Sequence, residues 1–107
     1  MILKYNIEID NQKFCDRIKQ LINLIYKLLP MREEHEDWET LLSTIMEEIS
    51  GISRLVPDQY QMEFLILLAK LEGLYSLTKE EDFFDFRRII FECLNLMNKV
   101  KEYVCDR

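Results

Sequence analysis

The chain has 107 residues, of which 49% are hydrophobic and 32% are charged, and its formal net charge is −6. This length and composition suit a single globular domain, residues 1–107, and exclude a disordered chain. Two glycines and two prolines are too few for the turns of an all-β fold, and the acidic balance makes nucleic-acid binding an unlikely main function.

Targeting and redox features point to the cytoplasm. Charged residues interrupt the first ten positions, which argues against a signal peptide. The longest apolar run, Phe64 to Ala69, is too short to span a bilayer, so no membrane association is expected. Three cysteines, Cys15, Cys93 and Cys105, are an odd count in a small chain and predict reduced thiols.

Residues 1–9 are expected to form an extended arm. Leu3, Tyr5, Ile7 and Ile9 alternate with polar residues, a period of two that is typical of a short strand. A lone strand has no partner within a helical chain, so we favour an arm packed on the helices. The alternative is a strand that pairs with its copy in a dimer or with a partner's sheet edge.

Two helices are expected in the first half of the chain. The first follows Asp10 as its cap and runs to about Leu29, because Pro30 disfavours helical geometry in the residue before it. The second is expected from near Arg32 to near Arg54, with Glu48 at the margin of the core, where its carboxylate needs a partner. The two buried stripes are Phe14, Ile18, Leu21, Ile25 and Leu28, and then Trp38, Leu41, Leu42, Ile45, Ile49 and Ile52.

Capping patterns open two further helices. Asp58 with Gln61 resembles a capping box, and Thr78 with Glu81 forms a T-x-x-E capping box. The segment Phe83–Val104 then carries a heptad seam and is apolar over most of its circumference, which is typical of a central helix. The seam residues are Phe83, Phe86, Ile90, Cys93, Met97, Val100 and Val104.

Four helices joined by short connections predict an all-α fold. The economical packing is an antiparallel, up-down-up-down four-helix bundle, preceded by the short extended arm. In this packing the first and fourth helices run antiparallel, so Cys15 lies near Cys105. We expect both to be free thiols in a reducing compartment.

Charge is unevenly distributed along the chain. Residues 32–54 carry seven acidic and two basic residues, a net charge of −5, whereas residues 11–29 carry a net charge of +3. We favour two neighbouring helices that attract each other, with solvated outer faces. The alternative is that an acidic face docks a basic surface of another protein. Its residues are Glu33, Glu34, Glu36, Asp37 and Glu39.

Metal-binding patterns are incomplete. His35 and Glu39 are four residues apart, but a di-iron bundle needs two Glu-x-x-His motifs and the chain has one histidine. The enzymatic alternative is a magnesium-dependent, all-helical nucleotide phosphohydrolase, in which four carboxylates converge on one pocket. They are Glu33 and Glu36, which give an E-x-x-E pattern, and Asp82 and Asp85, which match a second pattern approximately.

Catalytic motifs are otherwise missing. The cysteines have no flanking motif for nucleophilic catalysis, and two glycines can hardly build a phosphate-binding loop. No cofactor and no catalytic residue are therefore assigned. A third alternative is a helical subunit of a nucleoprotein assembly, with one basic patch formed by Lys13, Arg17, Lys19 and Lys27.

Surplus apolar surface favours a binding protein. Phe84, Phe91, Leu65 and Ile66 are more than one modest core requires, so another chain is expected to cover them. The leading hypothesis is a small, acidic, cytoplasmic regulator of the inhibitor, immunity or adaptor type. It would bind a protein partner through a helical face, using Phe84, Phe91 and the acidic residues, and would form a homodimer.

Overall fold

The computed structural model describes residues 11–54, 56 and 58–105. It contains four α-helices: α1 (Asn11–Glu33), α2 (Trp38–Ser53), α3 (Gln61–Gly73) and α4 (Phe83–Cys105). Three 3₁₀ turns accompany them: η2 (Asp58–Tyr60), η3 (Leu74–Ser76) and η4 (Glu80–Asp82). None of the described residues is in a strand, so the predicted all-helical fold with four helices is confirmed. The expected arm, residues 1–9, lies outside the described residues.

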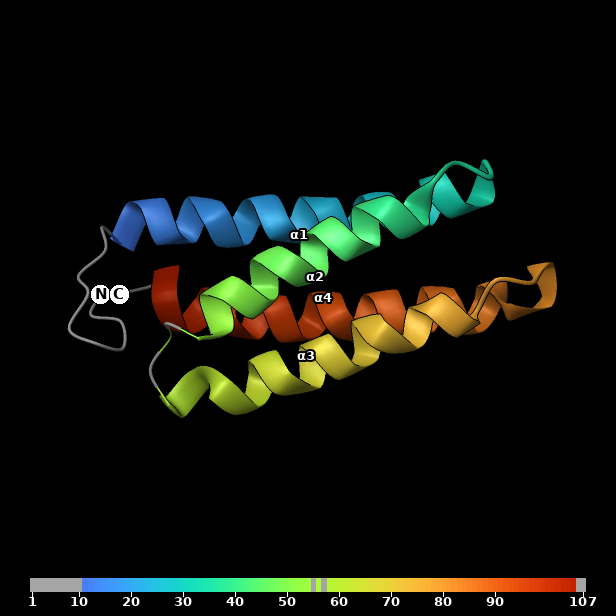
Figure 1. Cartoon of the computed structure of the whole chain (residues 1–107). Helices are drawn as coiled ribbons and strands as arrows, with labels where there is room; N and C mark the ends of the chain where they lie inside the picture. Colours follow the sequence, from blue (N-terminus) through green and yellow to red (C-terminus); the bar gives the residue numbers. More distant parts are fainter. Residues whose placement is uncertain (1–10, 55, 57, 106–107) are drawn as a thin grey trace.

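The four helices lie side by side along one axis (Figure 1). The α1–α2 and α3–α4 connections lie at one end of the molecule. The start of α1, the end of α2, the start of α3 and the end of α4 lie at the other end. The most extensive helix–helix contact is between α1 and α4, whereas α2 packs on α1 and α3, and α3 packs also on α4.

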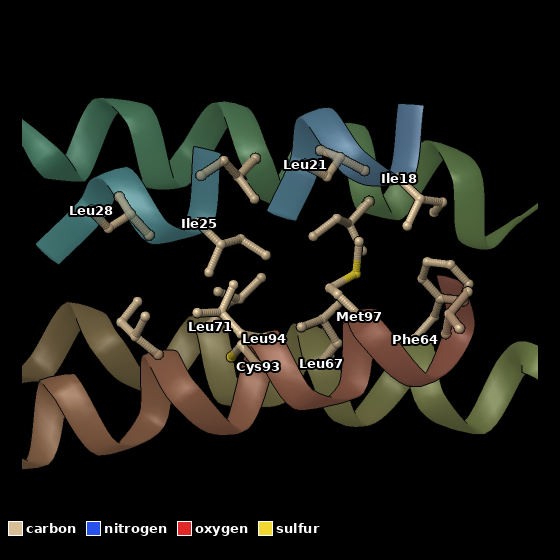
Figure 2. Packing of buried hydrophobic residues seen from close by; sticks show 14 of the residues in the cluster. Ile18, Leu21, Ile25, Leu28, Phe64, Leu67, Leu71, Cys93, Leu94 and Met97 are labelled. Carbon is tan, nitrogen blue, oxygen red and sulfur yellow. The ribbon is translucent and has the colours of Figure 1, made fainter. Parts of the chain in front are cut away.

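The core lies between the four helices. All five stripe residues predicted for α1 are buried, as are Phe86, Ile90, Cys93, Met97 and Val100 of the α4 seam. Figure 2 shows the α1 side chains pointing across to Leu67, Leu71, Leu94 and Met97. Burial of each such side chain contributes about 1.5–3 kcal/mol relative to exposure, so the stripes account for the assembly of the helices.

Polar contacts link the neighbouring helices around this core. The Arg17 guanidinium is 2.6 Å from the Glu48 carboxylate, which joins α1 to α2. The Ser43 and Tyr75 hydroxyls are 2.6 Å apart between α2 and η3. The Lys70 ammonium is 3.3 Å from the Glu92 carboxylate between α3 and α4. Arg17 therefore partners one oxygen of the Glu48 carboxylate at the margin of the core, and the other oxygen is buried without a hydrogen bond.

The first helix continues through Pro30, so the prediction that it ends at Leu29 is wrong. Proline cannot donate a backbone hydrogen bond, but only one turn of α1 follows it. A Schellman motif ends that turn: the Glu36 N–H donates to the Met31 carbonyl (2.8 Å) and the His35 N–H to the Arg32 carbonyl (3.2 Å). His35 occupies the left-handed position of the motif, with φ of 57°.

The second helix consequently begins at Trp38, not near Arg32 as predicted. Asp37 is its N-cap, because its carboxylate accepts from the Thr40 N–H (3.2 Å) and the Thr40 hydroxyl (2.6 Å). This cap satisfies one of the backbone donors that the start of a helix leaves without a partner.

Side-chain contacts of Gln61 and Asp82 tie the starts of the last two helices to the preceding segments. The Gln61 amide donates to the Ser53 and Val56 carbonyls, so it joins the end of α2 to α3. Before α4, the Asp82 carboxylate accepts from the Lys79 N–H (3.3 Å). The cap thus lies one residue after the predicted Thr78–Glu81 pair, and the 3₁₀ turn η4 precedes the α-helix.

Arg32 fastens the end of α1 to the α3–α4 connection. Its side chain is buried, and its guanidinium donates to the carbonyls of Leu77 (2.8 and 3.1 Å) and Lys79 (2.6 Å). The guanidinium carbon also lies 5.3 Å from the centre of the Phe83 ring and 4.8 Å from that of Phe86. Planar donors above two aromatic faces suit arginine and not lysine.

We expect Arg32→Met to lower the free energy of unfolding by about 2–3 kcal/mol, because the Leu77 and Lys79 carbonyls lose a charged donor. Arg32→Lys should recover only part of this loss, since one ammonium cannot reproduce the guanidinium fork. Urea denaturation measures both. Lys27→Met, an exposed site on the same helix, is the control and should change stability by less than about 0.5 kcal/mol. Equal stability of Arg32→Met and the control would contradict the role given to Arg32.

A disulfide joins Cys15 near the start of α1 to Cys105 at the end of α4. Their Cα atoms are 5.6 Å apart, within the range that a disulfide spans. The predicted proximity of the two cysteines is confirmed, but the prediction that both are free thiols is wrong. It was based on the expected compartment and not on the distance. Cys93 is free and buried, and burial raises the pKa of its thiol to about 12.

Thiol titration of protein purified without reductant tests this pairing. We expect no reactive thiol in the native chain, one in urea, and three in urea after reduction. Reduction should lower the free energy of unfolding by about 2–4 kcal/mol, because the bond closes a long loop of the unfolded chain. A Cys15→Ser variant is the control, and its stability should not respond to reductant. Three reactive thiols in urea before reduction would disprove the pairing.

Candidate functional site

Exposed aromatic side chains gather on α1 and α4. Phe84 is 76% exposed, Tyr26 is 54% exposed and Phe91 is 39% exposed. Phe84 and Phe91 are seven residues apart, so they lie on one side of α4. Tyr26 of α1 meets Phe91 edge to face, with ring centres 6.4 Å apart. The predicted exposure of Phe84 and Phe91 is therefore confirmed, and their burial by a partner is untested.

A groove runs between the two helices beside these rings. It has a volume of about 430 Å³, and its lining residues are Tyr26, Leu29, Pro30, Glu33, Phe83, Arg87 and Phe91. A second hollow of about 380 Å³ on α4 shares Arg87 and Phe91 with it and adds Phe84, Arg88, Glu92 and Asn95. The two form one surface, which we call the aromatic face: Tyr26, Pro30, Phe83, Phe84, Arg87 and Phe91.

Arginine side chains complete the aromatic face. The Arg87 guanidinium lies over the Phe91 ring, 5.5 Å from its centre. Arg88 beside it is 3.6 Å from the Asp85 carboxylate, and both side chains are exposed. Exposed aromatic rings together with arginine are the side chains that contribute most to protein–protein binding. A guanidinium held over a ring loses little freedom on binding.

The predicted acidic residues lie at one end of the molecule and not along one helix. Glu33 ends α1, Glu34, Glu36 and Asp37 form the connection, and Glu39 lies in the first turn of α2; all are exposed. We call them the acidic end. Glu80, Glu81, Asp82 and Asp85 of the α3–α4 connection and the start of α4 lie at the same end (Figure 1). The acidic end borders the aromatic face, because Glu33 lines the groove.

The structure does not gather these carboxylates into a metal site. Among the described residues, no three His, Cys, Asp or Glu side chains are placed to share a metal ion. Glu33, Glu36, Asp82 and Asp85 therefore do not converge, as the phosphohydrolase alternative requires. Asp82 caps the start of η4, and Asp85 pairs with Arg88. His35 lies in the turn after α1, so it does not share a helix face with Glu39.

A second group of exposed apolar residues lies on α3. Leu65 is 58% exposed and Ile66 is 40% exposed, as predicted, and Met62 beside them is 64% exposed. Met62 and Tyr26 were not predicted from the sequence as surface residues. The spacing of Met62, Leu65 and Ile66 places them on one helix face, so the exposure of Met62 could have been predicted from the sequence. Nothing in the sequence indicates that Tyr26 lies opposite Phe91.

No protein-family model, curated protein or solved structure matches this chain. Within the described part of the chain, no helix combines the length and apolar character needed to cross a membrane. The function is therefore inferred from the chain's own surfaces.

The Asp37 cap makes the stability of this end depend on pH. Hydrogen bonds from the Thr40 hydroxyl and then the Thr40 N–H hold the pKa of Asp37 below its ordinary value. A lowered pKa stabilises the folded chain above the ordinary value, and this stabilisation is lost as the pH falls through the lowered one. We expect the stability difference between the natural chain and Asp37→Ala to shrink from about pH 6 to pH 2 in urea titrations. A difference that stays constant over this range would contradict the cap's charge dependence.

Proposed function

We propose that this chain is a small, non-enzymatic protein-binding module of the inhibitor, immunity or adaptor type. Its docking surface is the aromatic face, and the acidic end borders it. The observation that carries the proposal is Phe84, a phenylalanine that is 76% exposed and that lines a hollow on α4 together with Phe91 and two arginines. Burial of a phenylalanine side chain contributes about 1.5–3 kcal/mol, so an apolar pocket on a partner would gain substantially from taking it.

Charge determines the kind of partner. The chain has a net charge of −6, and five of its carboxylates are exposed at the acidic end beside the docking surface. Such a field accelerates encounter with a basic surface, while the desolvated aromatic contacts provide most of the affinity. The partner is therefore a protein with a concave apolar site for Phe84 and a basic rim that faces Glu33 and its neighbours.

Three finer points belong to the same proposal. The helices follow an antiparallel, up-down-up-down course, which is supported by connections at alternate ends of the molecule (Figure 1). The module self-associates as a homodimer, which the exposed apolar residues of α3 support. It acts in the cytoplasm, where the Cys15–Cys105 pair would be exposed to reduction, and fractionation of cells of the native host tests this location.

Photo-cross-linking in the native host tests the docking surface. A photoreactive phenylalanine analogue at position 84 should give one adduct of defined mass, and the same analogue at exposed Thr44 on α2 should not. With the purified partner, Phe84→Ala should raise the dissociation constant by about thirtyfold, the loss typical of a central aromatic contact. Glu33→Lys should slow association and weaken its salt dependence.

Two outcomes would overturn this function. One is the same set of adducts from positions 84 and 44, which would show indiscriminate contact. The other is no adduct from position 84 in cells where the chain is expressed at its natural level. Unchanged affinity of Phe84→Ala for a partner that does cross-link would remove Phe84 from the docking surface.

A further inference from the structure

The outward side of α3 is apolar and carries no charge at its centre. Met62, Leu65, Ile66, Ala69 and Gly73 lie on this side, and all five are exposed. We call them the α3 face. Lys70 pairs with Glu92 of α4 at 3.3 Å, and Glu63 is seven residues earlier, on the same row as Lys70. Glu72 is exposed and borders the face at its C-terminal end, seven residues after Leu65. The centre of the α3 face is therefore uncharged.

A groove adjoins the α3 face on its α2 side. Its volume is about 600 Å³, and its lining residues are Met46, Glu47, Ser50, Gly51, Arg54, Leu68, Ala69 and Glu72. Ala69 belongs to both the groove and the α3 face. The central residues Ser50, Gly51 and Ala69 are small, and a Cβ atom added at Gly51 would meet nothing within 4 Å. The groove is therefore open to an incoming side chain.

The α3 face carries a projection and a hollow that fit each other. Met62, which is 64% exposed, precedes Ala69 by seven residues, or about 10 Å along the helix. A second copy turned by 180° about an axis between Leu65 and Ile66 would set each Met62 on the other copy's Ala69. Closed dimers use such self-complementary contacts.

The same 180° rotation would place opposite charges from the two ends of the groove next to each other. Arg54 lies beside the start of α3, because Gln61 donates to the neighbouring Ser53 carbonyl (2.6 Å). Glu72 lies towards the opposite end, near the hydrogen bond between Ser43 and Tyr75 (2.6 Å). The 180° rotation brings Arg54 of each copy towards Glu72 of the other.

From this match of shape and charge we infer that the α3 face is the interface of a homodimer. In this dimer, two antiparallel α3 helices pack across a twofold axis. Each Met62 fills the hollow formed by Ser50, Gly51 and Ala69 of the second copy, and two Arg54–Glu72 pairs flank the apolar centre. This inference rests on the self-association in the proposed function, and it leaves the aromatic face free for the protein partner.

Light scattering on the full chain tests the interface. The natural chain should have twice the monomer mass of 13.0 kDa, and Ile66→Asp should have the monomer mass. Gly51→Trp, whose Cβ would meet nothing within 4 Å and whose ring would occupy the hollow, should also be monomeric. Phe84→Asp on the aromatic face is the matched control and should remain dimeric while losing the partner, so a failed interface and a failed docking surface give different results.

Charge exchange tests the twofold arrangement itself. Arg54→Glu and Glu72→Arg should each raise the dimer dissociation constant by about tenfold, because both symmetry-related pairs are lost. The double variant should restore the natural value. A monomeric natural chain, a dimer that persists in Ile66→Asp, or a double variant weaker than either single variant would overturn the inference.

Discussion

The buried guanidinium of Arg32 is the interaction on which one end of the molecule depends. It holds two carbonyls of the α3–α4 connection and lies against two rings at the start of α4. One of these rings, Phe83, also lines the groove of the aromatic face. The arginine that orders the connections therefore also positions the residues from which Phe84 projects, so the fold and the proposed docking surface share one support.

This interaction also explains where the sequence-based prediction failed. The buried stripes of α1 and α4 follow from helical periodicity, and the structure buries them as expected. The boundaries at Pro30 and Thr78 were wrong because local rules were applied to positions that distant contacts determine. Arg32 meets Leu77 across 45 residues of sequence, and no local pattern indicates that contact. The last turn of α1, after Pro30, carries Arg32 to this contact, and α2 consequently starts later than predicted.

The candidate surfaces were predictable in part for a related reason. Phe84 and Phe91 exceed what the heptad seam of α4 can bury, so their exposure could be expected from the sequence. Tyr26 could not be assigned to the same surface, since its edge-to-face contact with Phe91 depends on how α1 packs on α4. The acidic residues were correctly seen as exposed but wrongly placed on one helix, because His35 adopts the left-handed conformation and ends α1 between them.

The disulfide between Cys15 and Cys105 determines how the chain carries mechanical load. A pulling force applied to the segments before Cys15 and after Cys105 passes through the sulfur–sulfur bond and bypasses the helices between them. An ATP-driven unfoldase that pulls on the chain before Cys15 would meet a covalent ring instead of a bundle that unfolds helix by helix. Reduction would open the ring, and the helices could then be unfolded one after another. The redox state of this one bond would therefore decide whether the unfoldase can translocate the protein as a single extended chain.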